Sequence, residues 1–170
     1  ERFGLFSIIV LGEVVVAVVL GASSVKLALN IGIIALLGTL VAIGLWWLYF
    51  DLVSHRKPKK GYWKFALWYY IHLPLTGGIV ALGAALQDII KHGSVHVPFN
   101  AHITFITGVS LTMICIALVM RAIEARHEFR RFFKFGPWLM IVLAGLLYLT
   151  LLVEINAVLL LVISVLTLLI

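Results

Sequence analysis

The sequence predicts an all-α protein, a polytopic bundle of about six transmembrane helices. Hydrophobic residues make up 64% of its 170 residues and charged residues only 12%, which excludes an ordinary soluble domain and is typical of multi-span membrane proteins. The apolar residues also lie in long runs, and about 20 of them in a helix cross a hydrocarbon core of about 30 Å. Because no water satisfies the backbone inside a bilayer, such runs must be helical.

Six apolar runs with short polar linkers define the expected spans of one transmembrane domain covering residues 1–170. Their bounds are roughly 3–20, 29–48, 63–86, 101–120, 135–153 and 155–170. The last span is the weakest, because Glu154 and Asn156 interrupt the apolar sequence and leave 157–170, about 21 Å of helix. The chain starts at Glu1 and stops within this run, so we expect a sequence trimmed at both ends.

Positive charge gathers in alternate linkers, which predicts the orientation of the chain. The linkers after the second and fourth runs are strongly basic, whereas the opposite linkers hold few charges. The basic residues are Arg56, Lys57, Lys59, Lys60, Arg121, Arg126, Arg130, Arg131 and Lys134. Because basic short linkers stay in the cytoplasm, both termini are expected there. The net charge of +6 thus reflects topology, and no nucleic-acid partner is expected.

The second basic linker has a helical composition. Residues 121–134 combine good helix formers with opposite charges three residues apart, such as Glu128 and Arg131. We expect this linker to continue the fourth span as a helix into the cytoplasm. It would then touch anionic headgroups, gate a cytoplasmic mouth or serve as a plain solvated connection. Aromatic residues that flank both basic linkers, such as Trp46, Trp63 and Trp138, are expected to be interfacial anchors.

Glu13 is the one ionisable residue between Phe3 and Leu20, and it lies near the middle of the first span. An acid at the centre of a membrane helix costs about 2.5–3.5 kcal/mol on insertion scales, so it should face protein or water and have a partner. We expect that partner to be His72, because counting from the cytoplasmic side puts both residues about 15 Å deep.

The third span is expected to break beside His72. Pro74 removes a backbone donor and frees a carbonyl near Tyr70, and Gly77 and Gly78 follow. Broken helices beside ionisable residues are where membrane proteins place ion or proton sites. The alternatives are that the proline only shapes packing and that the Glu13–His72 pair is structural.

Small residues predict which spans pack together. Gly77, Ala81 and Ala85 are spaced four apart and form a stripe along the third span, and Ala17 and Gly21 form a matching pair in the first. Such residues let membrane helices approach closely. We therefore expect the first and third spans to be neighbours.

The remaining polar residues predict no enzyme, cofactor or metal centre. Asp51, at the end of the second span, is expected to pair with Arg56 or Arg2. His92, His96 and His102 have no standard metal-ligand spacing, so no metal is expected. The sequence contains no phosphate-binding loop, nucleophile elbow or zinc-protease motif.

Three ordered segments resemble motifs of the bacterial low temperature requirement protein A family. They are Glu1–Glu13, Trp46–Asp51, and His72–Leu75 with Gly78–Val80. The resemblance implies a polytopic membrane protein whose signature polar positions are Arg2, Glu13, Asp51 and His72. It also implies a longer protein of which this chain is the later half, and it departs from the family where Gln87 and Asp88 stand in place of an expected acid.

The functional hypothesis combines these features. We expect a transporter-like or channel-like protein of the bacterial cytoplasmic membrane, in which Glu13 binds a proton or cation and His72 and Pro74 couple binding to helix movement. The alternative is a non-transporting scaffold or sensor of bilayer state, linked to growth in the cold. The expected partners are the lipid bilayer and either a second copy of the chain or the remaining half of a longer one.

Overall fold

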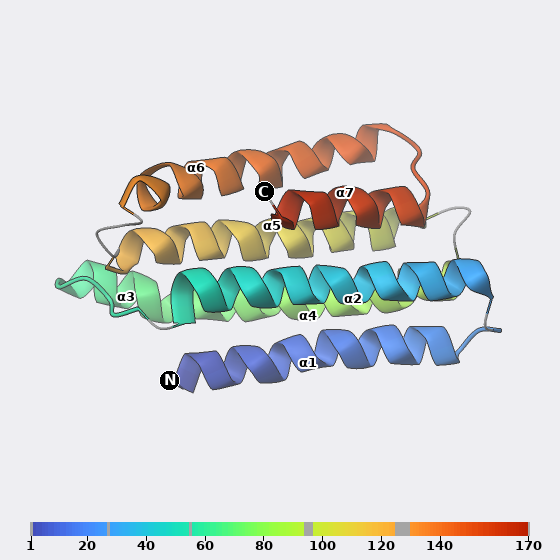
Figure 1. Ribbon diagram of the computed structural model, residues 1–170, viewed down its shortest axis with the longest axis horizontal. Helices are drawn as coiled ribbons and strands as arrows, with labels where there is room; N and C mark the ends of the chain where they lie inside the picture. The colour runs from blue at the N-terminus through green and yellow to red at the C-terminus, as the bar shows by residue number, and fades with distance from the viewer. Residues whose placement is uncertain (1, 27, 55, 94–96, 125–129, 170) are drawn as a thin grey trace.

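The computed structural model describes residues 2–26, 28–54, 56–93, 97–124 and 130–169. In these residues the chain folds into long, roughly parallel and antiparallel helices, with one isolated backbone bridge and no named strand (Figure 1). The helices are α1 (Arg2–Ser23), α2 (Leu29–Tyr49), α3 (Tyr62–Tyr70), α4 (His72–His92), α5 (Phe99–Ala122), α6 (Arg130–Leu147) and α7 (Ala157–Leu169), with a π-helical turn η1 (Phe50–Ser54) and a 3₁₀ segment η3 (Tyr148–Leu152). The all-α prediction is confirmed.

Five helical stretches are long and apolar enough to cross a membrane. They are Phe3–Ser23, Leu29–Ser54, Tyr62–His92, Phe99–Ala122 and Phe133–Leu152. The expected spans thus gain a few residues at most ends, because η1 prolongs α2, η3 prolongs α6, and α3 joins α4. The sixth expected span corresponds to α7, which has only 13 residues, about 20 Å of helix.

Helices α4 and α5 form the centre of the bundle. They pack tightly against each other, α1 packs against α4, and α6 packs against α5. Helix α2 contacts α1 on one side and α7 on the other. The prediction that the first and third spans are neighbours is confirmed by the contact of α1 with α4.

The small residues that produce this packing differ in part from those expected. Gly77 is exposed, and a Cβ added there would meet nothing within 4 Å. At Gly108 in α5, by contrast, a Cβ would lie 2.8 Å from the backbone oxygen of Gly78. Gly83 faces Val14 and Ala17 of α1. Gly77 therefore takes no part in this packing, and Gly78 and Gly83 provide the close approaches of α4 to α5 and to α1.

The two basic linkers meet at one end of the bundle, which we call the basic end (residues 54, 56–62 and 122–124, with the start of α1 and α6; Figure 1). The Lys59 N–H donates to the carbonyl of Ala122 at 2.8 Å, and the Glu124 N–H donates to the carbonyl of Lys57 at 2.9 Å. The predicted helical continuation of α5 is therefore wrong at Ile123, whose extended backbone ends the helix and forms the bridge with Pro58. Residues 125–129 lie outside the described part.

Candidate functional site

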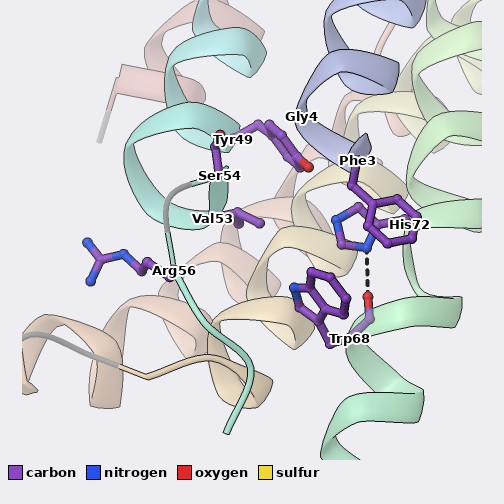
Figure 2. A pocket seen from close by; sticks show the side chains of 8 residues that line it. All are labelled: Phe3, Gly4, Tyr49, Val53, Ser54, Arg56, Trp68 and His72. Carbon is purple, nitrogen blue, oxygen red and sulfur yellow. Dashed lines mark hydrogen bonds between the residues drawn. The ribbon is translucent and has the colours of Figure 1, made fainter. Parts of the chain in front are cut away.

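A small pocket lies at the basic end, where five segments of the chain converge (Figure 2). About 20 Å³ of it is open to water, enough for about one molecule. Helix α1, the junction of α2 with η1, the linker that follows, α3 and α4 all contribute. Its lining residues are Phe3, Gly4, Tyr49, Val53, Ser54, Arg56, Trp68 and His72.

His72 is a deeply buried titratable group of this pocket, with 3% of its surface exposed. Its Nδ1 lies 2.7 Å from the backbone oxygen of Trp68. Because a carbonyl oxygen only accepts, Nδ1 must carry a proton. The neutral ring therefore has a lone pair at Nε2, and this nitrogen is buried and makes no hydrogen bond within the described part of the chain.

Aromatic rings enclose the imidazole on three sides. The Phe3 ring is stacked on it at 4.3 Å between centroids, with the planes 24° apart. Tyr49 and Trp68 meet it edge-on at 6.0 and 5.7 Å. Figure 2 shows the rings grouped around His72 and the hydrogen bond to Trp68. Phe3 thus presents its ring face to the imidazole, the arrangement in which an aromatic ring attracts a cation.

Two irregular backbone segments build the pocket. The helix of the third span is interrupted at Ile71, between α3 and α4, where Pro74 has no N–H to bond the carbonyl of Tyr70. The predicted break is therefore present. Opposite it, the π-helical turn η1 carries Val53 and Ser54 into the pocket wall. π-Helical turns are rare in proteins, and those that occur are often at functional sites.

Arg56 lines the pocket but directs its charge elsewhere. Its guanidinium points away from His72 in Figure 2 and lies over the Phe133 ring, with Cζ 4.3 Å from the ring centroid. Its Nη2 lies 3.5 Å from the backbone oxygen of Asp51. The predicted ion pair of Arg56 with the Asp51 carboxylate is thus replaced by a contact with the backbone, and Asp51 itself is exposed.

The predicted hydrogen bond between Glu13 and His72 is not formed. His72 is level with Phe3 at the start of α1, ten residues and about 15 Å from Glu13. Glu13 also lies on the exposed face of α1, away from α4. The estimate of equal depth was wrong because α3 adds nine residues before His72 that project beyond the start of α1 (Figure 1).

The other predicted site residues are dispersed. Arg2 begins α1, but its side chain lies outside the described part. Pro74 lies in the first turn of α4. Gly77 faces outward, whereas Gly78 packs on α5, where an added Cβ would lie 2.7 Å from Thr112 Oγ1.

The outer histidines occupy separate places. His92 pairs with Asp88, with Nδ1 3.3 Å from a carboxylate oxygen. His102 on α5 lies 3.2 Å from the hydroxyl of Thr150 in η3. His96 is outside the described residues, and those described contain no group of three metal-binding side chains.

Comparison with known families adds a second kind of observation to this geometry. Residues 1–170 match the family model described as bacterial low temperature requirement A protein (LtrA). The chain belongs to the LtrA family. No curated protein and no solved structure matches it. Membership and the apolar helices together establish a bacterial multi-pass membrane protein.

The pocket joins the three LtrA-like segments found in the sequence. Phe3 and Gly4 come from the first, Tyr49 from the second and His72 from the third. Sequence reasoning selected the polar members of these segments and missed the aromatic residues Phe3, Tyr49 and Trp68. The available signal was that two of these rings lie inside the same motifs and that Trp68 precedes His72 by one helical turn.

Proposed function

We propose that this LtrA protein is a proton-linked transporter or channel of the bacterial cytoplasmic membrane, with His72 as its proton-binding group. The observation that carries the proposal is the buried Nε2 of His72, which makes no hydrogen bond in the described part of the chain. An unsatisfied buried polar atom costs about 1–3 kcal/mol. A water molecule in the adjacent pocket would donate to this lone pair and remove the cost, and it would also deliver a proton to Nε2.

The chemistry of the lining favours a proton over a metal cation. Hydroxyls of Tyr49 and Ser54, one imidazole and aromatic rings line the pocket, without a carboxylate among the lining residues. Hard cations in proteins prefer several oxygen ligands, often carboxylates. An imidazole is the side chain whose ordinary titration range is closest to physiological pH.

The interrupted helix supplies a means of coupling. Protonation changes the charge of a ring whose Nδ1–H holds the carbonyl of Trp68, and that carbonyl lies in α3, just before the break. A change at His72 therefore acts on the relative position of α3 and α4. Glu13, which lies far from this pocket, belongs to a different surface of the protein.

Proton binding is testable without knowing the transported solute. A pH jump applied to proteoliposomes on a solid-supported membrane gives a transient current when protons bind inside the protein. We expect this current in the wild type and its loss in His72→Gln, which cannot titrate. His102→Gln is the matched control, because His102 is also buried but bonds Thr150 at a distance from the pocket.

The proposal fails if His72→Gln retains the full current or if the wild type gives none above protein-free liposomes. A sensor of bilayer state is the second candidate, favoured by the exposed rings of α3, where Tyr62 and Trp63 are 78% and 82% exposed. It predicts no proton current and hydrogen exchange in α3 that changes with lipid composition.

A further inference from the structure

Glu13 faces away from the protein in the middle of α1. Val14 and Val18 are buried on the inner side of the helix, whereas Glu13 shares the outer side with Ile9 and Val16, which are 64% and 49% exposed. Within the described part of the chain Glu13 forms no hydrogen bond and no ion pair. The acid is therefore left without a partner on a surface that is otherwise apolar.

This surface cannot simply face lipid. Helix α1 is the segment Phe3–Ser23 of mean hydropathy 2.7, so it crosses the bilayer and places Glu13 near its middle. An acidic side chain at that depth is expensive and is normally covered by protein or water. A covering helix that offers a hydrogen bond would remove the cost.

Gly12 provides the space for such a helix at the same depth. It is exposed, and a Cβ added there would meet nothing within 4 Å. The backbone of α1 is therefore bare next to the carboxyl group. Close approach of helix backbones at small residues, with polar side chains bonded across the contact, is the usual form of helix association in membranes.

We propose that this face of α1, centred on Gly12 and Glu13, is a homodimer interface in which the Glu13 carboxyl groups of two copies meet. Copies inserted in one orientation are related by a twofold axis along the membrane normal, which brings each residue of such a face to its own counterpart at equal depth. A protonated carboxyl is both donor and acceptor, so it is complementary to itself.

The charges of the chain favour a second copy in this symmetric arrangement over an asymmetric contact. The described lysines and arginines lie in linkers and at helix ends, so no basic side chain of another copy reaches the depth of Glu13. The group on this chain that matches the Glu13 carboxyl in depth, accessibility and hydrogen bonding is Glu13 itself.

Counting subunits by single-molecule photobleaching in dilute liposomes tests the interface. We expect dimers of the wild type and of Glu13→Gln, since an amide also pairs with itself. Glu13→Leu removes the polar contact and should raise the dimer dissociation constant about tenfold, the effect of about 1–2 kcal/mol. Gly12→Leu should do the same by steric exclusion, and Gly145→Leu, at another exposed and uncrowded glycine, should not.

Cross-linking locates the contact. In a variant whose single cysteine, Cys115, is replaced by alanine, oxidation of Gly12→Cys should give a disulfide-linked dimer, and Gly145→Cys should form no disulfide link. The proposal is overturned if the wild type is monomeric, if dimers survive unchanged in both Glu13→Leu and Gly12→Leu, or if the link forms at 145 instead of 12. If the protein is monomeric and Glu13 reacts with a membrane-soluble carbodiimide, the carboxyl group faces lipid and the proposed interface does not exist. These readouts are independent of the pH-jump current at His72.

Discussion

The imidazole of His72 is stacked on the ring of Phe3, with centroids 4.3 Å apart and planes inclined by 24°. This contact joins the start of α1 to the start of α4 and fixes the depth of His72 near the end of the bundle. It also separates the two ionisable residues that the sequence had placed together. The protein therefore has two distinct polar features, a histidine pocket at the basic end and an acid on an outer face.

Phe3 is expected to stabilise the pocket through the three contacts of its ring. It contacts Trp68 and Tyr69 edge-on as well as His72, and such aromatic pairs contribute about 0.5–1.5 kcal/mol each. Phe3→Leu should therefore lower the free energy of unfolding by about 1–3 kcal/mol, measured by steric trapping in bicelles. Leu5→Ala is the control, because Leu5 is 64% exposed on the outer face of α1. Equal stability of the two variants would contradict the assigned role of Phe3.

The contact of α4 with α5 depends on glycine at two facing positions. In Gly108→Ala the new Cβ would approach the Gly78 oxygen at 2.8 Å and the Leu82 nitrogen at 2.9 Å, both of them backbone atoms that cannot move independently. We expect a loss of about 1–3 kcal/mol of stability. Gly77→Ala, in open space, should leave stability level or raise it by up to about 1 kcal/mol. Tolerance of alanine at Gly108 would show that the helices are farther apart.

The backbone bridge between the two basic linkers should protect them from hydrogen exchange. Lys59→Pro deletes the N–H that donates to the carbonyl of Ala122. The amide of Glu124, which donates to the carbonyl of Lys57 in the same bridge, should then exchange at least about tenfold faster. This rate change corresponds to a loss of about 1.4 kcal/mol in the opening free energy of the bridge. Mass spectrometry of exchanged peptides measures this. Lys60→Pro, one residue farther along, serves as the control. If both variants exchange at the wild-type rate, the bridge does not hold the linkers together.

The orientation of the bundle is a separate prediction of the basic linkers. In a Cys115→Ala background, Lys60→Cys should react with a membrane-impermeant maleimide only from the cytoplasmic face, whereas Ser24→Cys, at the opposite end of the bundle, should react only from outside. Right-side-out and inverted vesicles distinguish the two faces. Labelling of the Lys60→Cys variant from outside would reverse the orientation.

Much of the fold was predictable, because the constraint that fixes it is local. The apolar runs gave the helices and their approximate bounds, Pro74 gave the break at Ile71, and Ala17 and Gly21 indicated the contact of α1 with α4. The end of α5 was not predictable in this way. Residues 121–134 have helical propensity, but two backbone hydrogen bonds to the other linker hold Ile123 extended instead.

The candidate site was also predictable only in part. The sequence by itself determined that Glu13 is the one ionisable residue between Phe3 and Leu20 and that the helix beside His72 is broken, since these features depend on residue type and on proline stereochemistry. Only the tertiary structure decided their surroundings. The depth of His72 depends on how far α3 projects beyond α1, and the direction in which Glu13 faces depends on the rotation of α1 about its axis. Side-chain packing between segments distant in the chain sets the projection and the rotation. Packing placed His72 among Phe3, Tyr49 and Trp68 and turned Glu13 outward.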